Sequence, residues 1–545
     1  AANTLASTVF SAGGGSNVRV SVVPYVAAVN PGLTSLSYVD TTAQSPYNGI
    51  WMRYAWIAYG GCKVGGAPYW GPPSSGGGGG SSGPGGSSTG DAGDARDILD
   101  ILEPIRHMAQ ELLGVRSAHA SSTGVTPNTV PPIVTTTQGG LKVPSGFIFV
   151  PDGSGYSTGE CEWLSNPATV SHYDLFPRTL NTAGQAVAWK GCVEARPTAA
   201  ELTTLNSWWG SSYATSTDWD VTDTPPGSDP NSLFVPYFWP DEPDYNMVTW
   251  NYMAPSLYAS GSGGFHNNYI NDGYYASGST TEALSPAWGN GWTLSGWWGA
   301  GQFILKYDGT TNSAAWNETG PTTAGPNAGC PEPLTPLTNN QQTVTNAINA
   351  MNYWYNGGTI ISEGFMWAWR TLSPNSPYFP TANTGMAYGS GSNKVIVLMT
   401  DGVNGLADNG DSNSSGTSSA NISDYSAYGY LGGYRLGSVD NISQYGPVSN
   451  PTNPPTDLTT YFDNRLLAAC TNAKAKGITV YTVLFSANIS ASLATHSQSI
   501  LQQCASTPSN AYSAANATAL NAAFATIATN AVAAPLHLAN YTGSP

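Results

Sequence analysis

Five apolar residues in a row, Val395–Met399, are followed directly by Thr-Asp-Gly. The run has no polar alternation, which is typical of a strand buried on both faces in a parallel sheet covered by helices. An aspartate at the carboxyl end of such a strand lies where α/β sheets place their ligand sites. Gly402 allows a sharp turn directly after it. We therefore expect an α/β sheet with Asp401 at its carboxyl edge.

The composition favours an extracellular protein. Only 9% of the 545 residues are charged, against about 25% in typical soluble domains. The formal net charge of −16 argues against nucleic acid or an anionic membrane surface as partner, because phosphate binding needs clustered Lys and Arg. No apolar run approaches the roughly 18 residues of a membrane span. We expect no membrane span in this chain, and a location outside the cell.

The six cysteines are an even number, which favours three disulfides formed in an oxidising compartment. Cys470 and Cys504 flank an expected strand, so we predict that they join two helices packed on one face of a sheet. The expected pairs are Cys470 with Cys504, Cys161 with Cys192, and Cys62 with Cys330. The first of these pairs has the most support from the sequence.

The two ends of the chain have α/β character, and the middle differs. Residues 1–12 look like the end of an amphipathic helix, and residues 18–25 look like a buried strand. Residues 33–332 are rich in aromatic residues, Gly and Pro. Strands and helices alternate again from residue 333. The elements expected there are an edge strand at 334–338, a strand at 478–485, and helices at 338–352, 363–372, 456–476 and 517–531.

Seven segments spread over most of the chain resemble the von Willebrand factor A (vWA) domain of TadG-like proteins. These are bacterial envelope proteins associated with tight-adherence pili. The most specific signals are GCVEARP, FVPYFWPDEPD and SEGFMWAWRTLSP. The matching segments are 18–32, 189–197, 220–244, 337–352, 357–374, 394–402 and 477–485.

The resemblance implies a doubly wound, mostly parallel vWA-type sheet with helices on both faces. The vWA-like domain would comprise residues 1–32 and 333–537, with a large β-rich, irregular insert at 33–332 and a tail at 538–545. The resemblance also implies a non-enzymatic protein that acts in adhesion or in pilus and envelope assembly. Its place would be outside the cell, on the bacterial cell surface or in the periplasm. Its ligand would be a protein or glycan surface.

In this family a metal-ion-dependent adhesion site combines an Asp-x-Ser-x-Ser loop with a Thr and an Asp. Thr359 and Asp401 match the last two parts, and a hard cation such as Mg²⁺ or Ca²⁺ takes about six oxygen ligands. No Asp-x-Ser-x-Ser motif occurs before Val18, and the first strand that should precede it is also absent. The alternative is that Asp401 only caps the turn after its strand.

The absent first strand is central in this fold, so a sheet without it leaves unpaired backbone amides and an open apolar slot. We expect a cleaved amino-terminal peptide that stays bound, or a segment of a neighbouring subunit, to supply the strand. A sequence shortened relative to the whole protein is the third explanation. The second functional hypothesis is therefore a subunit of an extracellular filament, completed by a strand from a neighbouring chain.

Other acidic residues suggest further sites. One candidate is a Ca²⁺ site formed by Asp241, Glu242 and Asp244. The alternative is that these acidic residues are there because they favour a turn. Glu194 and Arg196 are expected to form a buried ion pair.

An enzyme acting on polysaccharide is the third functional hypothesis. Acids such as Asp218 and Asp220 would share one face of a strand, and glycosidases use pairs of carboxylates. The sequence contains no His-Glu-x-x-His motif, which would have indicated a zinc enzyme.

Overall fold

The structure is a computed structural model of the whole chain. It describes residues 1–12, 17–33, 35–42, 48, 135–138, 141–144, 147–151, 159–163, 171–180, 184–203, 217–239, 267, 269, 325–352, 354, 358–402, 404–405, 425–430, 457–487 and 489–532. None of the helices in these residues is long and apolar enough to cross a membrane.

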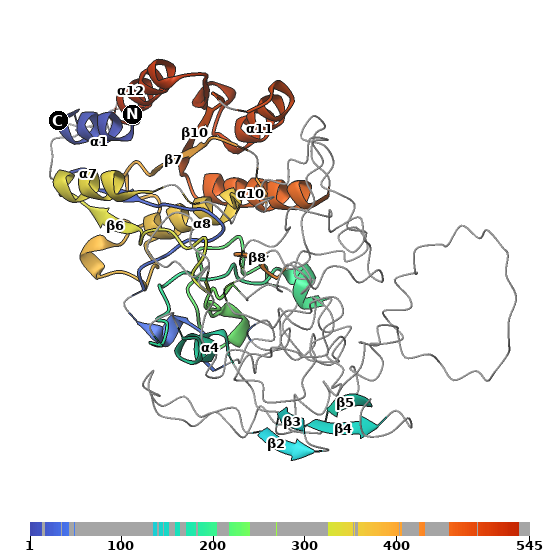
Figure 1. The fold of residues 1–545 in the computed structure, drawn as a ribbon. Helices are drawn as coiled ribbons and strands as arrows, with labels where there is room; N and C mark the ends of the chain where they lie inside the picture. The colour runs from blue at the N-terminus through green and yellow to red at the C-terminus, as the bar shows by residue number, and fades with distance from the viewer. Residues whose placement is uncertain are drawn as a thin grey trace, which may run out of the picture.

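Strands from the two ends of the chain form two separate sheets (Figure 1). In the first, β10 (Thr479–Phe485) lies between β7 (Val395–Thr400) and β11 (Ala511–Ala514), and all three strands are parallel. In the second, β1 (Val20–Val22) pairs antiparallel with β6 (Thr335–Thr338). The parallel sheet confirms an α/β fold, with the Val395–Met399 run as one of its strands. The described strands do not join into the single sheet that we expected.

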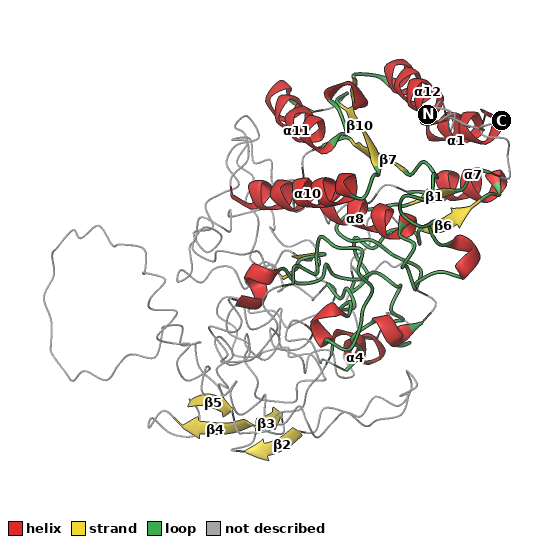
Figure 2. Ribbon diagram, turned by 180° about the vertical axis from the view of Figure 1, so that it is seen from behind, coloured by secondary structure: helices red, strands yellow, loops and turns green. Residues whose placement is uncertain are grey.

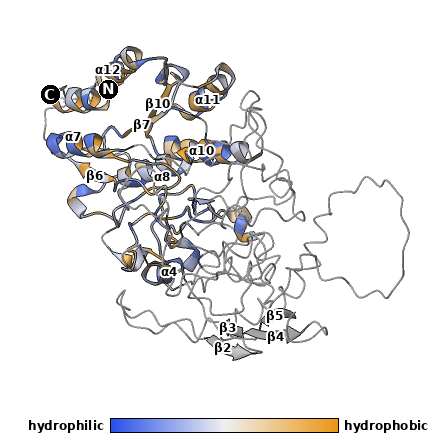
Figure 3. Ribbon diagram, viewed as in Figure 1, coloured by the Kyte–Doolittle hydropathy of each residue, from blue (hydrophilic) through white to orange (hydrophobic). Residues whose placement is uncertain are grey.

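One face of the parallel sheet is covered by α8 (Ile361–Leu372), α10 (Asp457–Ala475) and α11 (Ala491–Cys504). Ile396 and Leu398 point to this face and are buried against residues of these helices. Their alternation with half-buried neighbours along β7 follows from the two-residue period of a strand. Figure 3 shows β7 and β10 coloured largely as hydrophobic, as strands between two helix layers require.

The opposite face is covered by α12 (Ala517–Val532) and α1 (Ala2–Ala12). Helix α1 lies between α12 and α7 (Gln341–Ala350), so the first residues of the chain pack against the last helix (Figures 1 and 2). Helix α7 begins later than the expected cap at Thr338, because Asn340 is its N-cap and accepts a hydrogen bond from the Thr343 N–H. Such caps satisfy the free amides of a first helical turn.

The described middle of the chain contains short elements. They are β2 (Thr135–Gln138), β3 (Leu141–Pro144), β4 (Phe147–Pro151), β5 (Gly159–Trp163) and α4 (His172–Arg178). The short strands β8 (Tyr425–Ser426) and β9 (Gly429–Tyr430) lie between β7 and α10 in the sequence. Single-turn 3₁₀ helices lie at Leu36–Tyr38, Pro230–Ser232, Thr381–Asn383 and Pro508–Asn510. The pairs β2–β3, β4–β5 and β8–β9 are antiparallel.

Middle and ends share apolar cores. Phe234 from the middle of the chain packs on Trp367 of α8, with ring centroids 5.0 Å apart, and on Tyr378. Backbone bonds join the same parts: the Val193 N–H donates to Val29 at 3.3 Å, and the Ala195 N–H donates to Ala427 at 2.6 Å. The segments of the middle around Val193 and Phe234 are therefore packed on the two end parts of the chain.

One disulfide is as predicted and another is not. Cys470 and Cys504 join α10 and α11, as expected. Cys192 pairs with Cys330, so the predictions of Cys192 with Cys161 and of Cys330 with Cys62 are wrong. Local sequence could not predict this pairing, because it depends on contacts with a third segment. Val193 and Leu334 donate backbone hydrogen bonds to Val29 and Asn30, so the neighbours of both cysteines meet at residues 29–30. Cys62 and the side chain of Cys161 lie outside the described residues.

Candidate metal centre at the carboxyl edge of the parallel sheet

The loops that carry Thr359 and Asp401 lie against each other. Thr359 donates its N–H to the Gly405 carbonyl at 2.8 Å, and the Gly405 N–H donates back to Thr359 at 3.0 Å. Asp401 follows the last residue of β7 and is exposed, whereas Thr359 is half-buried. The structure therefore brings the two predicted residues to one edge of the sheet, on loops tied by two backbone hydrogen bonds.

Two side chains fix the loop after Asp401. The buried Asn404 accepts a hydrogen bond from the Ile361 N–H at 3.0 Å, which satisfies an amide in the first turn of α8. Ser497 of α11 donates its hydroxyl to the Gly402 carbonyl at 3.3 Å. The loop is thus anchored to both helices that approach this edge, and Asn404 was not predicted from the sequence.

Tyr25 reaches the same edge from the chain's first segment. Its hydroxyl donates to the carbonyl of Met399, and its ring lies against Gly364 of α8. Burial raises the pKa of Tyr25 above its usual value, and the nearby Asp401 carboxylate adds to the rise. The phenol therefore stays protonated and serves as a hydrogen-bond donor at neutral pH.

A neighbouring acid–imidazole pair links α10 and α11. Asp463 Oδ2 lies 2.7 Å from His496 Nε2, and both side chains are largely buried. Burial raises the pKa of Asp463, and the contact with His496 opposes this rise. The pair joins α10 and α11 next to the candidate site. The Asp463 carboxylate oxygen is in contact with the His496 imidazole.

The donors at this edge match a hard cation in kind but not in number. Thr359 and Asp401 offer a hydroxyl and a carboxylate, which are oxygen ligands of the type that Mg²⁺ and Ca²⁺ take. These two ligands would fill two of the about six coordination positions around such a cation. Within the described ranges, no group of three or more His, Cys, Asp or Glu residues is placed to hold a metal ion. The predicted acids Asp241, Glu242 and Asp244 lie outside the described residues.

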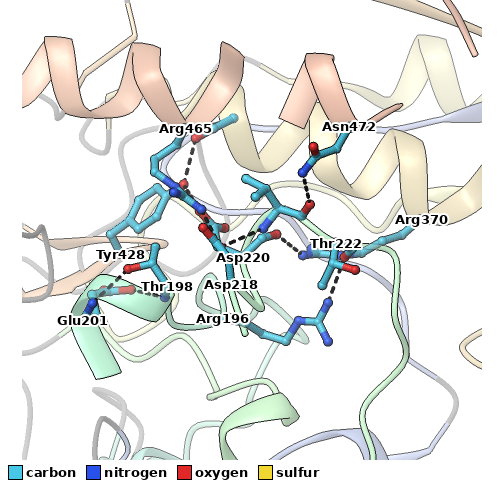
Figure 4. A network of polar contacts seen from close by, with 12 residues as sticks. Arg196, Thr198, Glu201, Asp218, Asp220, Thr222, Arg370, Tyr428, Arg465 and Asn472 are labelled. Carbon is cyan, nitrogen blue, oxygen red and sulfur yellow. Dashed lines mark hydrogen bonds and ion pairs between the residues drawn. The ribbon is translucent and has the colours of Figure 1, made fainter. Parts of the chain in front are cut away.

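A second polar cluster is buried between the middle of the chain and the helices (Figure 4). Arg465 of α10 donates to Asp220 and to Asp218, both at 2.7 Å. Arg370 of α8 donates to the Asp220 carbonyl at 3.0 Å, and Asn472 of α10 donates to the Val221 carbonyl at 2.9 Å. Asp218 and Asp220 are therefore partners of a structural arginine, and Asp220 is fully buried.

Glu363 of α8 lies in the same cluster. Burial raises its pKa to about 7, and the nearby Arg370 guanidinium opposes the rise. Its carboxylate is 3.6 Å from Arg370. A carboxyl group in such a site changes its charge near neutral pH, which couples the packing of α8 to pH.

The predicted ion pair between Glu194 and Arg196 is not formed. Arg196 instead donates to the carbonyls of Thr222 and Thr224, at 2.9 and 2.8 Å. Glu194 contacts His172 and accepts a hydrogen bond from Tyr425. Both side chains are buried, as expected, but each has partners that are remote in sequence.

Comparisons with known proteins give weak similarity to pilus proteins. No known family and no curated protein matches the sequence. Two crystal structures of the pilus adhesin SpaC from Lactobacillus rhamnosus GG, one in an open conformation, have 16% identity and a TM-score of 0.23 over 36% of this chain. The match covers 22% of the adhesin, so this chain spans less than a quarter of it.

The vWF domain of the type V pili tip protein Mfa5 from Porphyromonas gingivalis has 15% identity and a TM-score of 0.22. The match covers 37% of this chain and 79% of that domain. Similarity at these scores does not carry an assignment of function.

Proposed function

We propose that this protein works outside the cell as a non-enzymatic surface protein of the TadG-like kind, in adhesion or in tight-adherence pilus and envelope assembly. Two disulfides and a sparsely charged sequence support an oxidising, extracellular setting. The observation that carries the proposal is the backbone pairing of Thr359 with Gly405. It holds a hydroxyl and the Asp401 loop together at the carboxyl edge of a parallel sheet.

This edge would bind Mg²⁺ or Ca²⁺ through Thr359 and Asp401, with the other oxygen ligands coming from water and from groups outside these two loops. A bound divalent cation would supply positive charge and an open coordination position for a carboxylate of the ligand. The loop anchored by Asn404 and Ser497 would keep Asp401 in place. The aromatic middle of the chain would supply further contact surface.

Metal binding is tested with Mn²⁺ as a paramagnetic substitute for Mg²⁺, followed by electron paramagnetic resonance during titration. Wild-type protein should bind Mn²⁺, and both Asp401→Asn and Thr359→Val should weaken the binding at least tenfold. Asp229→Asn is a matched control, because Asp229 only caps a 3₁₀ helix and Asn caps equally well. Equal Mn²⁺ affinity in all four proteins would overturn the metal proposal.

Adhesion is tested on arrays of glycans and extracellular matrix proteins, probed in Mg²⁺ and in EDTA. We expect retention on at least one array component, lost in EDTA and in Asp401→Asn. Hydrolysis of an array glycan would contradict a non-enzymatic role. The ties of Asp218 and Asp220 to Arg465 already give these acids a structural function.

A second candidate function is a subunit of an extracellular filament completed by a strand from a neighbouring chain. The separation of β1–β6 from β7–β10–β11 favours it. Negative-stain electron microscopy at increasing protein concentration tests it. Fibres or chains of particles are expected, and single particles at every concentration would count against it.

A further inference from the structure

Two buried carboxyl groups meet where the middle of the chain contacts α8. Glu363 lies in the first turn of α8, Asp220 lies in the middle of the chain, and both side chains are fully buried. The two carboxyl groups are within hydrogen-bonding reach of each other. Ionised carboxylates only accept hydrogen bonds, so two of them cannot bond to each other. A hydrogen bond between Glu363 and Asp220 therefore needs a proton on one of the two groups.

The partners of each group indicate which one holds the proton. Asp220 Oδ2 accepts hydrogen bonds from Arg465 Nε at 2.7 Å and from the Tyr428 hydroxyl at 3.2 Å (Figure 4). Such bonds favour the ionised form of a carboxyl group. Within the described part of the chain, neither Glu363 oxygen receives an N–H or O–H hydrogen bond, and Asp220 Oδ1 receives none either. Arg370 Nη1 is 3.6 Å from Glu363 Oε2, which is too far for a hydrogen bond.

The charges around Glu363 come from several elements. Burial is the largest influence on its pKa and raises it to about 7. Arg370 of α8 and Arg196 from the middle of the chain oppose this rise, whereas Asp220 adds to it. Burial and the carboxyl groups of Asp220 and Glu363 raise the pKa of Tyr428, so this phenol stays protonated at neutral pH. Loss of the Glu363 proton would thus place a second carboxylate beside that of Asp220.

Polar side chains attach residues 218–223 to the helices. Arg370 of α8 donates to the Asp220 carbonyl at 3.0 Å, and Asn472 of α10 donates to the Val221 carbonyl at 2.9 Å. Bonds of this kind depend on a fixed geometry. Two adjacent carboxylates inside the attachment would repel each other strongly, because the buried site screens charge less than water does. Repulsion at this point would weaken the docking of residues 218–223.

We propose that Glu363 holds a proton and shares it with Asp220, which makes an acid-dependent latch between α8 and residues 218–223. With the proton bound, the Glu363 O–H donates to Asp220 Oδ1 and the segment stays docked. Without it, two carboxylates face each other and the segment opens more often. The docked state binds the proton more tightly than the open state, so the latch is closed at low pH and is lost as the pH rises through about 7.

The latch would make the proposed adhesion depend on pH. Residues 218–223 belong to the middle of the chain, where the proposed function places further contact surface. Adhesion would then be strongest under mildly acidic conditions. This consequence rests on the proposed function, whereas the latch itself does not.

Infrared spectroscopy tests where the proton lies. A protonated carboxylic acid has a carbonyl stretching band that an ionised carboxylate lacks. The wild type should show a band from a buried acid at pH 6 that disappears by pH 8, and Glu363→Gln should lack this band at both pH values. Glu332→Gln is the matched control and should keep it, because Glu332 instead accepts a hydrogen bond from Asn352. A wild type without the band, or a band that persists in Glu363→Gln, would overturn the proposal.

Amide hydrogen exchange tests whether the proton controls docking. Peptides covering residues 217–224 are followed between pH 6 and 8, and the rates are corrected for the chemical effect of pH on exchange. The opening equilibrium of the wild type should rise about tenfold over this range, as expected for a pKa raised from 4.5 to about 7. In Glu363→Gln the side-chain amide donates to Asp220 without titrating, so opening should not change with pH. Glu332→Gln should behave like the wild type.

Opening that is independent of pH in the wild type, or that changes equally in Glu363→Gln, would overturn the latch. The infrared titration needs only the wild type, so the proposal can be refuted even if Glu363→Gln does not fold. Neither experiment measures adhesion or Mn²⁺ binding, so failure here is distinct from failure of the proposed function.

Discussion

The Tyr25 hydroxyl donates a hydrogen bond to the carbonyl of Met399, a residue 374 positions away. The bond joins the segment after β1 to the carboxyl end of β7. Loss of the hydroxyl would leave a carbonyl in a largely apolar setting without its partner, which costs about 1–3 kcal/mol. Tyr25→Phe should therefore lower the free energy of unfolding by about this amount in urea titrations. Tyr512→Phe on the half-buried strand β11 is the control, and an equal loss in both variants would contradict the role of the Tyr25 bond.

The lack of a side chain at Gly364 leaves room for the Tyr25 ring. Alanine is favoured over glycine inside a helix by about 1 kcal/mol, but a Cβ at position 364 would overlap the Tyr25 ring. Overpacking of a core costs about 1–3 kcal/mol, so we expect Gly364→Ala to be destabilising overall. Gly227→Ala is the matched control, since nothing lies within 4 Å of its added Cβ. A stabilised Gly364→Ala protein in thermal unfolding would show that the ring does not occupy this site.

Glu363 makes stability depend on pH. Its pKa rises from 4.5 to about 7 on folding, chiefly through burial, so the folded protein binds this proton more tightly than the unfolded chain. The associated stability is present below the unfolded pKa and is lost as the pH rises through the folded value. The Tm of the wild type should therefore fall relative to that of Glu363→Gln between pH 5 and 7.5. Parallel Tm curves for the two proteins would refute the assignment.

The two disulfides should differ in their contribution to stability. Cys192 and Cys330 are separated by 138 positions, and Cys470 and Cys504 by 34. Chain-entropy estimates make the longer loop worth about 1 kcal/mol more. The Cys192→Ala/Cys330→Ala double variant should lose more unfolding free energy than Cys470→Ala/Cys504→Ala in urea titrations. Peptide mapping without reduction checks the pairing itself, and a linked peptide holding Cys161 and Cys192 would contradict it.

Much of the α/β framework was predictable because local patterns determine it. The apolar run at Val395–Met399 and the helix at 517–531 are present close to their expected bounds. The strand expected at 18–25 is shorter, Val20–Val22, because it has a partner on one side only, β6, among the described strands.

The site could be predicted in part. Thr359 and Asp401 were identified from the resemblance, but their relative placement depends on the Gly405 pairing, which no local pattern encodes. No sequence motif marks Asn404, Asp463 or His496. Their roles depend on contacts between separate helices and loops, which the sequence alone does not show. The partners of Arg196 and Glu194 were missed for the same reason.

The first and last parts of the chain fold as one unit. Leu5 of α1 and Phe524 of α12 pack in the same apolar cluster, so a double-mutant cycle with Leu5→Ala and Phe524→Ala tests whether the two parts depend on each other. Residues in contact show coupling of about 0.5–3 kcal/mol, whereas distant ones add within about 0.5 kcal/mol. We expect the double variant to lose less unfolding free energy than the sum of the single losses, by at least about 0.5 kcal/mol. Additive losses would show that the two ends belong to independent units.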